Sequence, residues 1–167
     1  MPSKRISASE SNGVYFLTCT IEHWYYIFDR HHRWEIIADA IRYAQTNKNL
    51  TLYGYVFMLN HLHLLVRSPD TIGFIRDFKR HTSKELHQNL ERTERNVLSL
   101  FVDENKKYKF WRTGNAPKRV ENKHFFLQKL NYIHLNPVRK NYVEKADYWH
   151  WSSANRNSPL FCSPLPV

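Results

Sequence analysis

The sequence predicts an α+β domain in which helices pack on one face of an antiparallel sheet. Short apolar segments rich in β-branched and aromatic residues alternate with amphipathic segments of helical period, and two of the apolar segments nearly adjoin. The 167 residues contain no internal repeat and suffice for one hydrophobic core. We therefore expect one domain over residues 12–155, a flexible tail at 1–11 and an irregular tail at 156–167.

The first half of the chain supplies three predicted strands and one helix. Residues 14–20 are apolar and rich in β-forming side chains, so they are expected to form a buried strand. Apolar residues at helical spacing predict a helix over about residues 33–46. Two further strands are expected at 50–58 and 61–67, and the short connection between them favours an antiparallel pair.

The second half supplies two helices and a short strand. The second helix is expected from residue 71 to about 90, and a short strand at 108–112. A third helix should start at residue 122 and end near 135 or 136, because Pro137 disfavours helical geometry in the residue before it. This order of elements favours a ferredoxin-like arrangement.

Composition narrows the class of partner. Lys and Arg number 25 against 15 Asp and Glu, which gives a formal charge of +10, and aromatic residues reach 15%. A basic chain rich in rings is typical of proteins that bind nucleic acid. The two cysteines, Cys19 and Cys162, form no Cys-x-x-Cys pair, which argues against a cysteine zinc site or a disulfide framework. No signal-peptide core or apolar run of about 20 residues occurs, so we expect a cytoplasmic protein without a membrane partner.

His61 and His63 form a candidate metal site. Side chains alternate along a strand, so the two imidazoles should share one face with Cα atoms roughly 6.5 Å apart. Leu62 and Leu64 would then face the core. A His-x-His pair alone is a weak signal and more often means two surface or half-buried histidines. Asn60 and the turn at the start of the strand favour the metal site.

Tyr132 and Asn136 are spaced i, i+4, so they share a face of the third helix. A phenol with a pKa of about 10 is a poor nucleophile, but a metal on the scissile phosphate makes its attack feasible. Asn136 could add an amide oxygen to the metal. Alternatively, Tyr132 is a half-buried aromatic and Asn136 is a helix C-cap. His134 lies about 200° around the helix from Tyr132, so it is expected to be a surface or packing residue.

Two basic sets are candidates for binding nucleic acid. In one, cations between residues 104 and 123 are interleaved with aromatic rings, and in the other, cations recur along the second helix. Rings that stack on bases beside cations that bind phosphates suit single strands. A solvated loop with buried rings and a solvated helix face are the alternatives. Lys4 and Arg5 belong to the expected tail. The candidate contacts are Arg76, Lys79, Arg80, Lys107, Lys109, Trp111, Arg112, Lys118 and Arg119.

Two stretches of the chain resemble the REP-associated tyrosine transposases, a single-tyrosine HUH family. Residues 55–67 (YVFMLNHLHLLVR) resemble the HUH motif, and 132–142 (YIHLNPVRKNY) with 151–153 (WSS) resemble the tyrosine segment. With weaker similarity from Val14 onward, the resemblance covers about residues 12–155. It implies a ferredoxin-like catalytic domain that cleaves and rejoins single-stranded DNA at hairpin-forming repeats. It also implies Mg²⁺ or Mn²⁺ as cofactor and a transient 5′-phosphotyrosine linkage that leaves a free 3′-OH.

Carried over by position, the resemblance implies that His61 and His63 are metal ligands, Tyr132 is the nucleophile and Asn136 is a further ligand. Related enzymes include swapped dimers, so a homodimer is possible and Tyr132 could serve either its own metal site or a partner's.

The chain departs from the family pattern at two turns. Leu59 stands where the family has Pro before Asn-His, and Lys140, Asn141 and Tyr142 stand where it has Ala-Gly-Leu. Asn141 can adopt a left-handed conformation, as Gly would. Neither change affects a predicted catalytic residue.

Three alternatives remain open. A non-catalytic module could bind single-stranded nucleic acid on the sheet, although the aromatic motif typical of RNA-binding sheets is absent. A metal-dependent nuclease that uses water would not need Tyr132. A domesticated transposase would carry the same motifs.

Overall fold

The computed structural model describes residues 5–166. Its strands and α-helices follow the predicted order along the chain. They are β1 (Val14–Thr20), α1 (Arg33–Asn47), β2 (Thr51–Phe57), β3 (His61–Arg67), α2 (Thr71–Thr93), β4 (Lys118–Arg119) and α3 (Lys123–Arg139). Short 3-10 turns occupy Ala8–Glu10, Glu22–Trp24, Arg95–Phe101 and Ala146–Tyr148. No α-helix within residues 5–166 is long and apolar enough to cross a membrane.

The four strands form one antiparallel sheet in the order β2-β3-β1-β4. β3 is central, because it pairs along its length with both β1 and β2. The turn between β2 and β3 closes with the Met58 N–H donating to the His61 carbonyl over 2.8 Å. The predicted fold class, an α+β fold with an antiparallel sheet and a tight β2–β3 connection, is confirmed.

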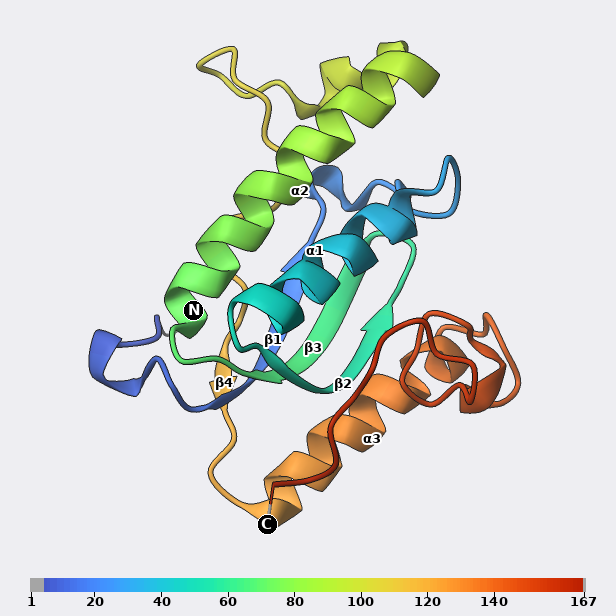
Figure 1. Cartoon of the computed structure of the whole chain (residues 1–167). Helices are drawn as coiled ribbons and strands as arrows, with labels where there is room; N and C mark the ends of the chain where they lie inside the picture. Colours follow the sequence, from blue (N-terminus) through green and yellow to red (C-terminus); the bar gives the residue numbers. More distant parts are fainter. Residues whose placement is uncertain (1–4, 167) are drawn as a thin grey trace.

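The layering differs from the prediction in one respect. Along β3, Leu62 and Leu64 point into the larger core beneath α1 and α2, whereas Leu65 joins a smaller core with Phe126 and Ile133 of α3. Helices α1 and α2 therefore cover one face of the sheet, and α3 covers the other (Figure 1). The central strands are apolar on both sides, so both faces need a cover.

Gly54 in β2 lets α3 approach the sheet closely. The β2–β3 register shifts between Leu52 and Gly54, and a Cβ atom at Gly54 would collide with the side chain of Leu130. A glycine at an irregular point of a strand commonly marks such a close approach. Helix α3 therefore packs closely against β2.

Helix α3 continues one turn beyond the predicted end. Pro137 lies inside the helix, which ends at Arg139. Asn141 adopts a left-handed conformation with φ 59°, as expected for a residue in place of Gly. Its N–H donates to the Val138 carbonyl, and the Tyr142 N–H donates to the Pro137 carbonyl. This closure is a Schellman motif, which stabilises a turn that the proline weakens.

The predicted strand at 108–112 is wrong, and β4 lies further along the chain at Lys118–Arg119. The 108–112 segment makes only isolated bridges, one of them between Ile21 and Trp111. Phe110 and Trp111 are both buried in the larger core. Two consecutive side chains in the same core break the alternation of a ladder, so the segment crosses the end of β1 instead of extending the sheet.

The segment 151–153 covers the free edge of β2. The Phe57 N–H donates to the Trp151 carbonyl over 2.8 Å, and the Ser153 N–H donates to the Tyr55 carbonyl over 3.0 Å. Residues 156–166 contain no helix or strand, and Leu160 is buried in the larger core. Residues 151–153 therefore act as a short additional strand at the edge of β2.

The predicted N-terminal tail is partly structured. Ser11 is buried, and its carbonyl accepts the Thr71 N–H at the start of α2. Arg5 is exposed, and Lys4 lies outside the described residues.

Candidate active site

His61 and His63 lie side by side on the face of the sheet that α3 covers. Their ring centroids are 5.0 Å apart and their planes meet at 77°. His63 is only 4% exposed, whereas His61 is half-buried. The alternation of β3 thus brings both imidazoles to one face, as the sequence predicted.

Asn60 fixes the tautomer of His61. The Asn60 Nδ2 donates to the Trp24 carbonyl over 2.9 Å, which orients the amide. Its Oδ1 then faces His61 Nδ1 at 2.7 Å, so Nδ1 must carry the proton. The lone pair of His61 therefore resides on Nε2, in the arrangement that outer hydrogen bonds impose on metal-binding histidines.

Two residues of β1 support His63. Thr18 lies opposite it in the ladder, and the Thr18 hydroxyl is 2.8 Å from His63 Nδ1. When the hydroxyl accepts the Nδ1 proton, Nε2 is left with a free lone pair. The ring of Phe16 stacks on His63 with centroids 5.3 Å apart. These contacts hold the imidazole in one orientation.

The environment keeps both imidazoles neutral. Burial, followed by the charge of Lys140, lowers the pKa of His61 to about 4. Burial lowers the pKa of His63 to about 3, with smaller contributions from His61, Arg139 and Lys129. Neutral imidazole is the form that binds a metal. At neutral pH, both side chains are thus ready to act as ligands.

Tyr132 comes to the same place from α3. Its ring centroid is 5.3 Å from that of His63 and 5.8 Å from that of Phe16, both edge to face. The side chain is 39% exposed, so one part of the ring packs on the imidazole while another meets solvent. A single chain therefore places the tyrosine beside the histidines.

Asn136 is buried one turn beyond Tyr132. The C-cap of α3 is Lys140, so the alternative role of Asn136 as a helix cap is wrong. Asn136 is 4% exposed. His134 Nε2 instead lies 2.8 Å from the Ser153 hydroxyl, in the packing role expected for it.

Cations surround the tyrosine. The Arg139 guanidinium lies 4.3 Å from the centroid of the Tyr132 ring, and its Nη2 donates to the Tyr132 carbonyl over 2.6 Å. The Lys129 ammonium is 5.6 Å from the same centroid, and burial, followed by the charge of Lys118, lowers the pKa of Lys129. Lys118 pairs opposite Phe16, which places it on this face of the sheet. These cations have no carboxylate partner in the part of the chain that the structure describes.

The donor set fits a divalent cation with open coordination positions. No group of three His, Cys, Asp or Glu side chains converges within residues 5–166, so a site made only of those residue types is absent there. His61 and His63 supply two imidazole nitrogens, and Asn136 is a buried amide one turn after Tyr132 on α3. Two nitrogens and one oxygen would leave positions for phosphate and water.

Several predicted nucleic-acid contacts have structural roles instead. Trp111 is buried, and its Nε1 donates to the Thr82 hydroxyl over 2.9 Å, so the prediction that it stacks on a base is wrong. Lys79 donates to the carbonyls of Arg112 and Gly114 and joins α2 to the following loop.

Other predicted contacts are ion-paired or lie on the far face. Arg76 pairs with Asp77, Lys109 with Glu22, and Arg119 with Glu10. Arg76 and Arg80 line a groove of about 890 Å³ between α1 and α2, on the face opposite the histidines. The structure thus brings Lys118 to the histidine face, whereas Lys107 is exposed in the loop before Tyr108.

Sequence reasoning missed Thr18, Lys129 and Arg139. Thr18 could be found only from the register of β1 against β3, which the sequence does not state. Arg139 lies seven residues after Tyr132 on the same side of a helix. This spacing would have predicted the contact of Arg139 with Tyr132, but the helix was expected to stop before Pro137.

The chain belongs to the IS200-like transposase family. The profile described as "Transposase IS200 like" matches residues 11–134, a range that includes both histidines and Tyr132. No curated protein matches the chain in sequence.

Two solved structures share the fold. One is a REP-associated tyrosine transposase bound to a REP hairpin, with 16% sequence identity and a TM-score of 0.66 over 92% of this chain and 82% of that one. The other is a putative transposase from Deinococcus radiodurans R1, with 15% identity and a TM-score of 0.50 over 78% of this chain and 95% of that one. At these identities, the likeness concerns the fold.

Proposed function

We propose that this chain is a metal-dependent transposase that cleaves and rejoins single-stranded DNA through a 5′-phosphotyrosine on Tyr132. The observation that carries the proposal is the contact of the Tyr132 and His63 rings, whose centroids are 5.3 Å apart. A nucleophile beside a pair of neutral imidazoles is the arrangement that such a reaction needs. Membership of the IS200-like family supports the same class of reaction.

The histidines and Asn136 would hold the cofactor. His61 and His63 would use their Nε2 atoms and Asn136 its amide oxygen to bind a divalent cation, Mg²⁺ or Mn²⁺. When bound, such an ion withdraws electron density from the scissile phosphate and offsets its charge. The hydrogen bonds that the two Nδ1–H groups donate to Asn60 and Thr18 would keep the rings in the ligating orientation.

Tyr132 would carry out the covalent step. Its phenol oxygen attacks phosphorus and loses its proton to solvent, while the bond from phosphorus to the 3′ oxygen breaks. The leaving 3′ oxygen takes up a proton and becomes the free 3′-OH of the upstream strand, and the downstream strand stays joined to the tyrosine through its 5′ phosphate. Because the linkage retains a phosphodiester, a new 3′-OH can attack it and release the tyrosine without ATP.

Arg139 would position the nucleophile. Its guanidinium lies over the Tyr132 ring, where it stabilises negative charge that develops on the phenol oxygen. Its hydrogen bond to the Tyr132 carbonyl fixes the guanidinium on the same helix. Lys129 and Lys118, which lack carboxylate partners among the described residues, would bind the DNA phosphates on either side of the cleaved bond.

Tyr132 would act on the histidines of its own chain, because that chain alone brings the rings together. The substrate we propose is a DNA hairpin with unpaired flanks, because the REP-associated transposase of like fold is bound to a REP hairpin. A cytoplasmic location and a homodimer remain predictions.

The test is adduct formation on a denaturing gel. A labelled single-stranded DNA hairpin incubated with the protein and Mn²⁺ should yield a covalent protein–DNA band. Tyr132→Phe should abolish the band while DNA binding persists, because the lost hydroxyl contributes only the covalent step. Tyr43→Phe, which removes a hydroxyl from an exposed tyrosine of α1, is the control and should retain the band.

Two outcomes would contradict the proposal. An adduct that persists in Tyr132→Phe would assign the nucleophile to another residue. Cleavage that persists in Tyr132→Phe without any adduct would identify a nuclease that uses water.

A further inference from the structure

Trp24 is a tryptophan that the fold leaves open to solvent. It is 60% exposed, whereas Trp111 and Trp151 are buried. The Arg112 guanidinium lies over its ring, 4.0 Å from the centroid. One face of the indole is therefore backed by a cation, and the exposure of the ring leaves surface for a second flat partner.

The backbone that presents this ring is strained. His23 and Trp24 both have left-handed backbones, with φ 60° and 52°. Neither is a glycine, so the conformation is costly and persists only where neighbouring contacts impose it. One such contact is the hydrogen bond from Asn60 Nδ2 to the Trp24 carbonyl. Strain of this kind is common where a protein holds a side chain in place for a ligand.

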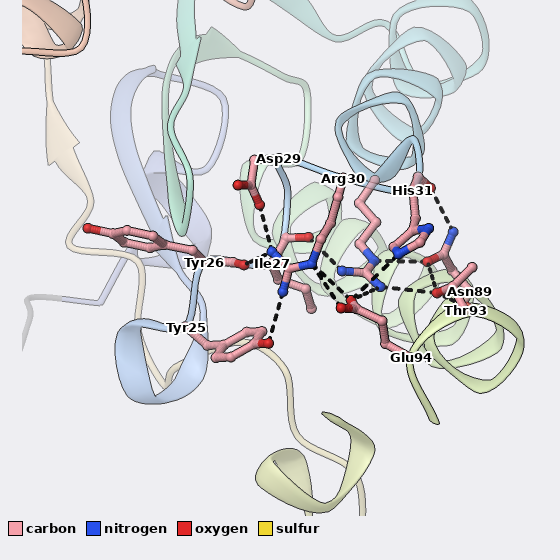
Figure 2. A network of polar contacts seen from close by, with 10 residues as sticks. Tyr25, Tyr26, Ile27, Asp29, Arg30, His31, Asn89, Thr93 and Glu94 are labelled. Carbon is pink, nitrogen blue, oxygen red and sulfur yellow. Dashed lines mark hydrogen bonds and ion pairs between the residues drawn. The ribbon is translucent and has the colours of Figure 1, made fainter. Parts of the chain in front are cut away.

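The other end of the loop is held by a polar network (Figure 2). Arg30 donates to the Tyr26 carbonyl over 2.8 Å and to the Tyr25 hydroxyl over 2.9 Å. Its Nε also pairs with Glu94 of the α2 C-cap at 3.0 Å, and the fully buried Arg33 binds the same carboxylate. The ring of Tyr26 points away from this network (Figure 2). Residues 24–26 are thus fixed before any ligand arrives.

The backbone of Trp24 is joined to the candidate metal site through Asn60. Asn60 donates to the Trp24 carbonyl with its nitrogen and accepts from His61 with its oxygen, at 2.9 and 2.7 Å. Only two hydrogen bonds therefore separate the Trp24 backbone from an imidazole ligand. A nucleotide whose phosphate lies at the histidines would have a neighbouring base within reach of the indole.

We propose that Trp24, backed by Arg112, is a stacking platform for one unpaired nucleobase of the DNA strand that is cleaved. The inference rests on the proposed function and adds a binding site to it. Every base has a π-face, so an indole can stack on any of them, and the guanidinium behind it adds attraction for the strand. The platform holds the strand next to Tyr132 and so keeps the scissile phosphate in register.

The experiment uses the full chain with Tyr132→Phe as the parent, so that binding is measured without cleavage. The probe is a DNA hairpin with oligothymidine flanks in which one flank residue at a time is replaced by the fluorescent base 2-aminopurine. The parent should quench 2-aminopurine at one position in the strand. Adding Trp24→Ala should abolish that quenching and weaken binding about tenfold, whereas Trp24→Phe should retain most of both.

Tyr43→Ala is the matched control, because Tyr43 is also 60% exposed but lies on α1, on the opposite face of the sheet. It should leave affinity and quenching unchanged. A strand with an abasic residue at the quenched position tests the contact itself. This strand should bind the parent about tenfold more weakly but bind the Trp24→Ala protein no differently from the intact strand.

The outcomes separate the two proposals. If the parent binds the strand but Trp24→Ala binds it equally well, or no more weakly than Tyr43→Ala does, the platform is refuted. If the parent itself binds no DNA, the proposed function fails. Equal losses from the abasic residue in both proteins would assign the base to another site and refute the platform. Trp24→Phe keeps an aromatic ring at this position. It therefore shows whether weaker binding by Trp24→Ala comes from loss of the ring or from lower stability, which the melting temperatures of the two variants measure.

Discussion

The two faces of the sheet differ in what they contribute, although they share the same strands. On the α1/α2 face, Leu62 and Leu64 of β3 belong to the larger core. On the α3 face, the residues that alternate with them are His61 and His63, and the apolar core there is small. Along this strand, residues that stabilise the fold alternate with residues that are proposed to act in the reaction. A substitution on the histidine face should therefore lower activity, and a substitution at the adjacent leucine should lower the free energy of unfolding.

The largest effect is expected from His63→Ala. Removal of one of two imidazole ligands should lower the rate of adduct formation on the order of a thousandfold, because the cation contributes several kcal/mol to the reaction. Single-turnover gels at saturating Mn²⁺ measure it. His134→Ala is the control, since His134 packs against Ser153 outside the imidazole pair. If adduct formation proceeds at the normal rate in His63→Ala, the chemistry does not belong to this face.

The neighbouring change, Leu64→Ala, should act on stability. Leu64 is 1% exposed, and truncation of a buried leucine costs about 2–5 kcal/mol because a cavity remains. Urea titration followed by circular dichroism measures the free energy of unfolding. The fraction that remains folded should form the adduct at the normal rate. A folded Leu64→Ala protein without activity would show that the two faces are coupled.

A smaller effect is expected from Arg139→Gln. Loss of the guanidinium over the Tyr132 ring should slow adduct formation about tenfold, a typical consequence of removing one stabilising charge. Arg42→Gln makes the same change of charge on α1, where Arg42 pairs with Asp39. Single-turnover rates for the two variants sharpen the comparison, because only the first lies on the tyrosine face. Equal rates in both would mean that Arg139 acts through net charge alone.

The sequence predicted the local features of this fold well and its layering less well. The boundaries of β1 and β3 followed from β-branched and aromatic runs, and the alternation of β3 placed the two histidines on one face. The face covered by α3 did not follow, because Val56 and Leu65 make the second side of the sheet as apolar as the first. Periodicity cannot choose between two apolar faces.

The site was predicted only as far as local rules extend. The spacing from Tyr132 to Asn136 fixed their shared helix face, but the supporting contacts depend on tertiary pairing. Arg139 was missed because Pro137 was expected to stop a helix that a left-handed Asn141 closes later. Trp111 was expected to stack on bases, yet the hydroxyl of Thr82 binds its indole inside the core.

The segment 151–153 also bears on how copies of this chain can associate. An unpaired strand edge is a template onto which another chain adds, with a risk of uncontrolled association. Here the backbone groups of Tyr55 and Phe57 are already bonded to residues from the same chain. Two copies thus cannot join their sheets through this stretch of β2, and any dimer must be built on another surface.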